Sequence, residues 1–295
     1  MSIGIDTQCL QCMLQRNLET VRPLGSEEQA MAFSRRMMQL FIDAPDGVPS
    51  PWFSPAIAQL MHEMYGLPLD RFREEREQSN RFALERMPRI RELVRSAPDP
   101  VFAGLQFAIL GNYLDFSALQ GKVSFETLEQ MLLDALNMEL DRQAYAALQD
   151  DLATAKRLVY LTDNAGEIVF DRVFAEEIAR RYPQLEITFC VRGAITLNDA
   201  TREDAAAVGI PFPVIDNGNN VAGTLLDQLS DEARSALDAA DVILAKGMAN
   251  TETLWGCDYN VYYAFLVKCQ KFVTHFGKPM LTPLLVRQRG KEEQQ

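Results

Sequence analysis

The chain has 295 residues, of which 47% are hydrophobic and 24% are charged, as expected for a globular protein with a substantial core. Its formal net charge of −12 argues against a nucleic-acid partner, because proteins that bind nucleic acid carry basic patches. No apolar run reaches the roughly 18 residues of a membrane helix, and no secretory signal is recognised. The number and spacing of the five cysteines do not indicate a set of disulfide bonds. We therefore expect a cytoplasmic protein without a membrane partner.

The first half of the chain is predicted to be helical, because its apolar residues recur mostly at three- and four-residue spacing. The helices are predicted at 27–43, 54–65, 70–87, 101–113 and 124–134. Pro88 is expected to end the third of them, and Pro98 to Pro100 separates it from the fourth. We interpret residues 1–152 as a helical bundle or cap domain.

The pattern changes after about residue 153, where short apolar runs alternate with amphipathic stretches. Strands are predicted at 157–161, 186–191, 213–215 and 242–245, with helices between them. A further helix is predicted at 259–268, followed by Cys269. Strands that alternate with helices indicate βαβ units, so residues 153–295 are predicted to form an α/β domain with a parallel sheet covered on both faces.

Polar and glycine residues follow each predicted strand. They are Asp163, Asn164, Gly166 and Glu167 after the first strand; Arg192, Gly193 and Asp199 after the second; Asp216 to Asn220 after the third; and Lys246, Asn250 and Glu252 after the fourth. The carboxyl ends of parallel strands lie at one edge of a sheet, which is where ligands of such sheets bind. We therefore expect these residues to converge.

The chemistry of this set suits a hard cation. Asp163, Asn164 and Asp199 supply carboxylate and amide oxygens, which Mg²⁺ and Mn²⁺ prefer, and histidine and cysteine are missing from these loops. Gly166 permits close approach of the backbone to an anion, and Lys246 is a natural partner for phosphate. Each residue also has an ordinary explanation as a helix cap or a turn, but four such loops together favour a site.

Three ordered motifs carry a resemblance to a known family. They are Thr162-Asp163-Asn164-Ala165-Gly166-Glu167 with Phe170-Asp171, Arg192-Gly193 followed by Asn198-Asp199-Ala200-Thr201, and Lys246-Gly247-Met248-Ala249-Asn250-Thr251-Glu252. The chain resembles the damage-control phosphatase family, formerly catalogued as domain of unknown function 89. Further points of likeness are Cys9-Leu10-Gln11-Cys12, which is similar to the prokaryotic branch, the Arg76–Asn80 neighbourhood, Gly111-Asn112, Asp115-Phe116 and Lys268-Cys269.

The resemblance implies a helical N-terminal domain packed on a Rossmann-like three-layer α/β/α domain with a mostly parallel sheet. It implies one divalent metal ion held by Asp163, Asn164 and Asp199, with Lys246 on the phosphate. It further implies a metal-dependent phosphatase acting on small phosphometabolites, either sugar phosphates or damaged side-products. The chain departs from the family at Ala194-Ile195, where proline is usual, which affects the shape of that loop.

The hypothesis for the mechanism is in-line attack of water on a metal-bound phosphate. The residues expected to bind the phosphate or the leaving group are Lys246, Arg192, Asn250 and the amides near Gly166 and Gly193. Glu167 is a candidate for proton transfer or orientation, as is Glu252. Asn112 and Asp115 are expected at the pocket mouth, although a helix end explains them equally well, and the same applies to Arg76 and Asn80.

Several alternatives stay open at this point. Asp163 is a possible covalent nucleophile, although the second Asp of an Asp-x-Asp motif is absent and we favour water. A methyltransferase using S-adenosylmethionine and a non-catalytic metabolite-binding module are the competing functions. Oxygen ligands accept Mg, Mn, Co or Ni, so the metal is not identified. Cys9 and Cys12 fit metal, redox or structural roles, of which we favour a structural role or an adventitious disulfide. The oligomeric state is not predicted.

Overall fold

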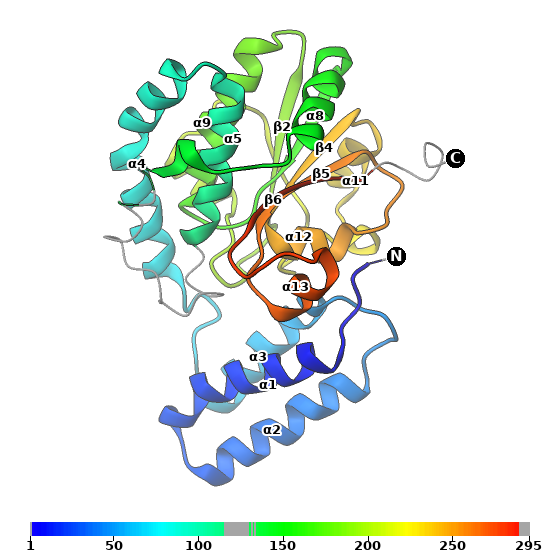
Figure 1. Ribbon diagram of the computed structural model, residues 1–295. Coiled ribbons are helices and arrows are strands. Elements are labelled where there is room, and N and C mark those ends of the chain that lie inside the picture. The colour runs from blue at the N-terminus through cyan, green and yellow to red at the C-terminus, as the bar shows by residue number, and fades with distance from the viewer. Residues whose placement is uncertain (1, 115–129, 131, 133, 289–295) are drawn as a thin grey trace.

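The computed structural model describes residues 2–114, 130, 132 and 134–288 (Figure 1). Its helices are α1 (Thr7–Val21), α2 (Glu27–Ile42), α3 (Ser54–Tyr65), α4 (Arg73–Ser96), α5 (Pro100–Gly111), α8 (Arg142–Thr154), α9 (Glu167–Arg181), α10 (Arg202–Val208), α11 (Asp231–Asp238), α12 (Gly247–Leu254) and α13 (Gln270–Phe276). Its strands are β1 (Arg157–Leu161), β2 (Glu186–Val191), β3 (Val214–Asp216), β4 (Val242–Lys246), β5 (Val261–Leu266) and β6 (Pro283–Gln288). No helix among these residues is both long and apolar enough to span a bilayer.

The described strands form one six-stranded sheet with the order β3-β2-β1-β4-β5-β6. The first five strands pair in parallel, and β6 pairs antiparallel with β5. The chain moves outward from β1 to β3 and then returns to β4 on the other side of β1. The direction in which successive strands are added to the sheet therefore reverses between β1 and β4. Ligands of such sheets bind in the crevice between the loops that follow the two strands at this point.

Helices cover both faces of the sheet, because the residues of each strand alternate between two cores. In β1, Leu158 and Tyr160 belong to the larger core, which includes residues of α4, α5, α8, α9 and α10. Val159 and Leu161 belong to a second core with residues of α11, α12 and α13. This arrangement confirms the prediction of a three-layer α/β/α fold with a mostly parallel sheet.

A third core lies within the segment that we call the cap, residues 2–72 with helices α1, α2 and α3. Phe33, Met37 and Phe53 are fully buried there. Figure 1 shows the cap at one end of the sheet, beside α12 and α13, and the backbone amide of Ile3 donates to the carbonyl of Glu252 in α12 at 2.9 Å. The helices before residue 153 thus contribute to two different cores. A division into domains at residues 152 and 153 stays a prediction.

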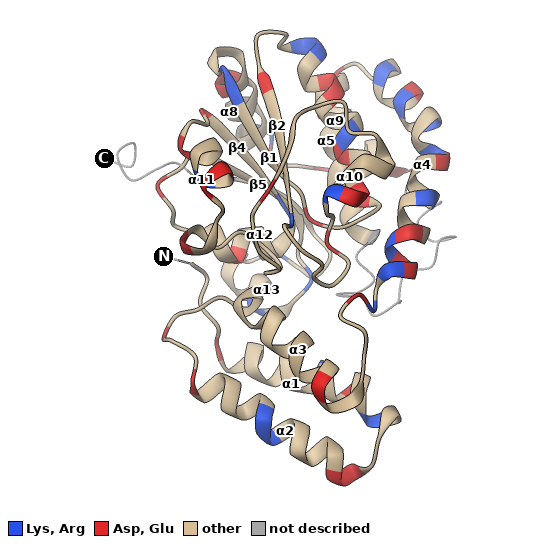
Figure 2. Cartoon of the chain, turned by 180° about the vertical axis from the view of Figure 1, so that it is seen from behind, with Lys and Arg blue, Asp and Glu red and all other residues tan. Residues whose placement is uncertain are grey.

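The structure corrects the prediction that Pro88 ends a helix. Helix α4 continues to Ser96, and Pro88 lies on its exposed side. Ile90 and Val94 beyond the proline are buried in the larger core, and Arg91 forms a bidentate ion pair with Glu176 of α9. This packing outweighs the loss of one backbone hydrogen bond at the proline. Figure 2 shows the expected mixture of acidic and basic residues along α4.

The helix predicted at 259–268 is wrong, since Val261–Leu266 form strand β5. All six residues of the strand are buried, so apolar and polar residues do not alternate along it. Without such a periodicity the sequence does not distinguish a strand from a helix. The sequence does not predict strand β6 either, because only its first four residues are apolar and the run is too short to indicate a strand. The helix predicted at 124–134 lies mostly outside the described residues.

Candidate functional site

The turn after β1 places Asp163 and Asn164 at the carboxyl edge of the sheet and leads into α9 at Glu167. Gly166 in this turn has a φ of 75°, a left-handed conformation that favours glycine. A Cβ atom at this position would lie 2.7 Å from Cβ of Ser79 in α4. Glycine is therefore required by both the backbone conformation and the close approach of α4.

Backbone hydrogen bonds hold this turn against the loop after β2. The amide of Ala200 donates to the carbonyl of Asp163 at 2.8 Å, and the amide of Ala165 donates to Asn198 at 2.9 Å. Asn164 and Asp199 form an isolated antiparallel β-bridge. As a result, Asp163, Asn164 and Asp199 all lie on the wall of one cavity.

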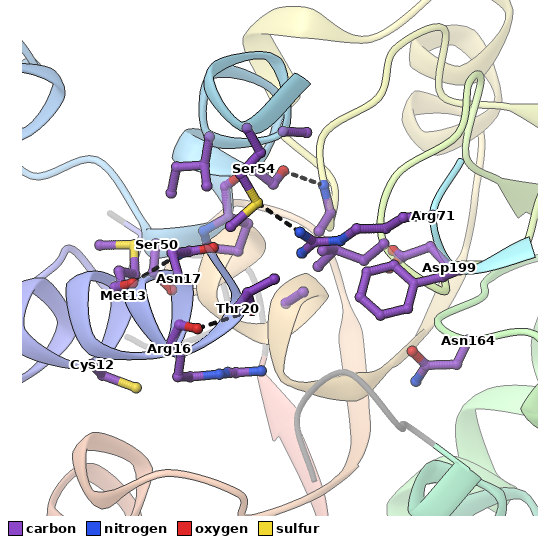
Figure 3. A pocket seen from close by; sticks show the side chains of 18 of the residues that line it. Cys12, Met13, Arg16, Asn17, Thr20, Ser50, Ser54, Arg71, Asn164 and Asp199 are labelled. Atoms are coloured by element: carbon purple, nitrogen blue, oxygen red, sulfur yellow. Dashed lines mark hydrogen bonds between the residues drawn. The ribbon is translucent and has the colours of Figure 1, made fainter. Parts of the chain in front are cut away.

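Two amide side chains orient the acids of this wall. Nδ2 of Asn164 donates to Oδ2 of Asp163 and to Oε2 of Glu167, both at 2.8 Å. Nδ2 of Asn112, at the end of α5, donates to the same two oxygens at 3.0 and 2.8 Å. Because the nitrogen of Asn164 faces the acids, its oxygen end is directed toward the cavity (Figure 3).

The backbone after β4 approaches Asp163 from the other side. Gly247 has a φ of 77°, and a Cβ atom there would lie 1.9 Å from Oδ2 of Asp163. No side chain fits between them. The loops after β1, β2 and β4 thus meet around a single carboxylate, at the reversal in strand order.

Arg192 is buried behind the two aspartates and does not line the cavity. Its Nε donates to Oδ2 of Asp199 at 2.6 Å, and its Nη2 lies 3.8 Å from Oδ1 of Asp163. Its Nη1 donates to Oδ1 of Asn250 at 3.3 Å. The guanidinium therefore orients the acids that were expected to bind metal, and phosphate binding by Arg192 stays a prediction.

Lys246 is fully buried at the end of β4 and does not line the cavity. Its ammonium donates to Oε1 of Glu167 at 2.5 Å, to Oδ1 of Asp171 at 2.8 Å and to the carbonyl of Ala108 at 2.8 Å. These three bonds use all the donors of the ammonium. Lys246 thus contacts Glu167 and does not line the cavity, and phosphate binding by Lys246 stays a prediction.

The buried group of Lys246, Glu167 and Asp171 holds one cation and two acids. Burial raises the pKa of Asp171 to about 7, with the charge of Lys246 opposing this and the charge of Glu167 adding to it. Burial by itself lowers the pKa of Lys246, but the two carboxylates outweigh burial and raise it above its ordinary value. The Asp171 carboxyl therefore retains its proton to near neutral pH.

Other predicted phosphate ligands are occupied by contacts within the protein. The amide of Gly166 donates to Oδ1 of Asn80 at 2.7 Å, and the amide of Gly193 donates to Oδ1 of Asn217 at 2.8 Å. Asn250 is buried and donates to the carbonyls of Thr162 and Lys246. These contacts shape the three loops, and phosphate binding by Gly166, Gly193 and Asn250 stays a prediction.

Glu252 lines the cavity and connects α12 to the cap. Its carboxylate accepts hydrogen bonds from the backbone amide and the hydroxyl of Ser50. Burial raises the pKa of Glu252, although the bonds from Ser50 oppose this. Asn80 and Arg76 lie behind the loops and do not line the cavity. Asp115, predicted at the pocket mouth, lies outside the described residues.

The cavity has a volume of about 480 Å³, within the range of small-molecule sites. Its positively charged lining residues are Arg16 of α1, Arg71 before α4 and Lys268 after β5, and sequence reasoning missed the two arginines. Arg16 and Arg71 lie in stretches with ordinary helical charge patterns, so no sequence signal marks them. Lys268 was noted only as part of the resemblance.

The donor set of the cavity wall fits a hard divalent cation, with two carboxylates and an amide oxygen from adjoining loops. Among the described residues, no group of three or more His, Cys, Asp or Glu side chains forms a metal site. The candidate set therefore depends on Asn164, whose oxygen end is directed toward the cavity (Figure 3). Metal ligation by Asp163, Asn164 and Asp199 stays a prediction.

Cys12 also lines the cavity, and Cys9 lies one turn before it in α1. Both are free thiols, as are Cys190, Cys257 and Cys269. Cys190 is buried in β2, where burial raises its thiol pKa to about 12. Such a thiol is not reactive, which agrees with a packing role.

Comparisons with known proteins place this geometry in a family. Residues 5–282 match the damage-control phosphatase ARMT1-like domain. An uncharacterised protein of Methanocaldococcus jannaschii is 30% identical over 94% of this chain and 93% of its own length. A protein of Archaeoglobus fulgidus named damage-control phosphatase is 33% identical over 75% of this chain and 76% of its own length.

A solved structure is similar as well. The crystal structure of a DUF89 family protein from Pyrococcus horikoshii superposes with a TM-score of 0.79 at 26% sequence identity. It covers 96% of this chain and 99% of its own chain. The family match extends over most of the chain and includes each loop of the cavity wall described above. The chain belongs to the damage-control phosphatase family.

Proposed function

We propose that the protein is a divalent-metal-dependent phosphatase that hydrolyses phosphate monoesters of small metabolites, such as sugar phosphates or damaged side-products. The observation that carries the proposal is the meeting of Asp163, Asn164 and Asp199 on one cavity wall at the reversal in strand order. The family match and the name of the relative from Archaeoglobus fulgidus support phosphatase activity.

The metal would be held by Asp163, Asn164 and Asp199, with Mg²⁺, Mn²⁺, Co²⁺ or Ni²⁺ as candidates. A divalent ion bound there supplies positive charge to the phosphate oxygens and lowers the pKa of a bound water. The protein's own contribution is orientation. Asn112 fixes Oδ2 of Asp163, and Arg192 fixes Oδ2 of Asp199, so the wall is formed before substrate binds.

Glu167 is proposed as a positioning residue, since it accepts from Asn112, Asn164 and Lys246 and is completely buried. Lys246 forms a fully buried ion pair with Glu167, which holds the Glu167 carboxylate in place behind the cavity wall. Glu252 is the carboxylate on the cap side of the cavity, and we propose that it contacts the leaving group of the substrate. Water is proposed as the nucleophile, because both acids of the wall are held by hydrogen bonds from neighbouring side chains.

Hydrolysis of p-nitrophenyl phosphate and of a panel of phosphometabolites tests the proposal, with each of the four metals and with EDTA. Activity should require metal and should fall to background in Asp163→Asn and Asp199→Asn. Asp216→Asn is the matched control, because Asp216 is an aspartate at the carboxyl end of β3 that does not line the cavity. Full metal-dependent activity in Asp199→Asn would refute the assignment. Saturable binding of phosphometabolites without turnover in any metal would support the binding-module alternative.

A further inference from the structure

The cavity has walls of different charge. The edge of the sheet contributes Asp163, Asn164 and Asp199, whereas the cap contributes Arg16 from α1 and Arg71 from the segment before α4. Figure 3 shows the guanidinium groups of both arginines within the cavity, on the cap side of Asn164 and Asp199. The cap therefore adds positive charge to the cavity from two residues that have no role in the proposed phosphatase chemistry.

The hydrogen bond of the Arg71 guanidinium goes to a neutral side chain. Within the described part of the chain, no carboxylate lies within 4.0 Å of its guanidinium, and Nη1 donates instead to Sδ of Met61 at 2.6 Å. A thioether is a weak, neutral acceptor. The guanidinium also lies 4.8 Å from the centre of the Phe72 ring, and this contact with a neutral ring does not neutralise its charge.

Arg16 lies close enough to Arg71 for the two charges to interact. Burial and then repulsion from Arg16 lower the pKa of Arg71, and Glu75 opposes this effect. Two guanidinium groups in a partly buried cavity repel each other, and an anion between them relieves the repulsion and accepts charge-assisted hydrogen bonds. Arginine is suited to carboxylates and phosphates because its planar donors match both groups.

The remaining cap lining indicates what lies between the two charged walls. Most of it is apolar and includes Met13, Ile57, Met61, Leu69 and Phe72. A volume of about 480 Å³ accommodates a whole small metabolite and not only a phosphate group. A ligand that reaches from the sheet edge to the arginines therefore has an extended body with an anion at each end.

We propose that Arg16 and Arg71 form a second anion-binding site, so that the preferred substrates carry a carboxylate or a second phosphate in addition to the phosphate that is hydrolysed. The substrate class rests on the proposed phosphatase function. The anion site itself rests only on the cap geometry.

The first experiment does not depend on activity. Isothermal titration calorimetry of the full chain in EDTA, with inorganic phosphate as the probe, measures anion binding at the cap. Arg16→Gln and Arg71→Gln should each weaken phosphate binding by about tenfold or more, and Arg71→Lys should retain part of it. Arg35→Gln is the matched control, because Arg35 is exposed on α2 and does not line the cavity. Equal phosphate affinity in the wild type and both glutamine variants would overturn the site.

The second experiment measures kcat/KM of the metal-loaded protein for matched substrate pairs. Fructose 1,6-bisphosphate is compared with fructose 1-phosphate, and 3-phosphoglycerate with glycerol 3-phosphate. The wild type should prefer the member with the second anionic group in at least one pair by about tenfold, and the pair identifies that group as phosphate or carboxylate. Arg16→Gln and Arg71→Gln should remove the preference while retaining activity on the member whose single anionic group is the phosphate ester.

The two experiments separate the possible failures. Phosphate binding that depends on both arginines, without hydrolysis of any ester, would refute the proposed phosphatase and leave the anion site intact. An equal loss of kcat/KM for both members of each pair would show that the arginines bind the hydrolysed phosphate, and would overturn the proposed substrate class.

Discussion

Replacement of Gly247 by alanine tests whether the backbone after β4 sets the position of Asp163. The new Cβ would lie 1.9 Å from Oδ2 and 2.3 Å from Cγ of that carboxylate, so one of the two groups has to move. The φ of 77° adds strain for a residue with a side chain. Asp163 cannot move freely, because Asn112 and Asn164 both donate to the same oxygen.

The expected loss of stability is the sum of two effects. A left-handed conformation costs a residue other than glycine about 1–2 kcal/mol, and overpacking in a filled site costs about 1–3 kcal/mol more. We therefore expect the free energy of unfolding to fall by about 2–5 kcal/mol, measured by urea denaturation at equilibrium. Displacement of a carboxylate that positions the reacting groups should also lower kcat by about 100-fold.

Gly277→Ala is the control for backbone strain. Gly277 ends α13 with a φ of 63°, but nothing lies within 4 Å of a Cβ atom built there. Its substitution should cost only the conformational part, about 1–2 kcal/mol, and should leave activity unchanged. If the two variants lose equal stability and Gly247→Ala retains wild-type kcat, the close packing around Asp163 has no role in the site.

Three further predictions follow from the same contacts. Because burial raises the pKa of Asp171 to about 7 from 3.8, its carboxyl contributes stability that is present below pH 4 and is lost as the pH rises to 7. Asp171→Asn keeps an acceptor for Tyr160 and Lys246 but does not titrate, so urea denaturation from pH 4 to 8 should show a flatter decline than in the wild type; an unchanged pH profile would contradict this. Asn80→Ala leaves the buried amide of Gly166 without its acceptor and should lower the free energy of unfolding by about 1–3 kcal/mol, whereas exposed Gln78→Ala should have little effect. Saturating Mn²⁺ at about 100 times its Kd should stabilise the wild type by about 2.7 kcal/mol in thermal denaturation, and the same gain in Asp199→Asn would argue against ligation by Asp199.

Parts of the fold follow from local patterns in the sequence. Strands β1, β2 and β4 are short apolar runs between amphipathic stretches, and their parallel pairing follows from the helices between them. Strand β5 has no such signal, because it is buried on both faces and every residue is apolar or aromatic. The extension of α4 beyond Pro88 depends on packing against α9, which is distant in sequence.

The sequence by itself determined that Asp163, Asn164 and Asp199 belong to loops at one edge of the sheet, because the carboxyl ends of parallel strands lie at the same edge. Only the tertiary structure decided which cations face the cavity. Lys246 follows a strand like the acids, yet its side chain turns into the core to meet Glu167 and Asp171. Arg16 and Arg71 reach the cavity because the cap packs over the sheet edge. Contacts between segments that are distant in sequence produce no periodic pattern of residues from which they could be predicted.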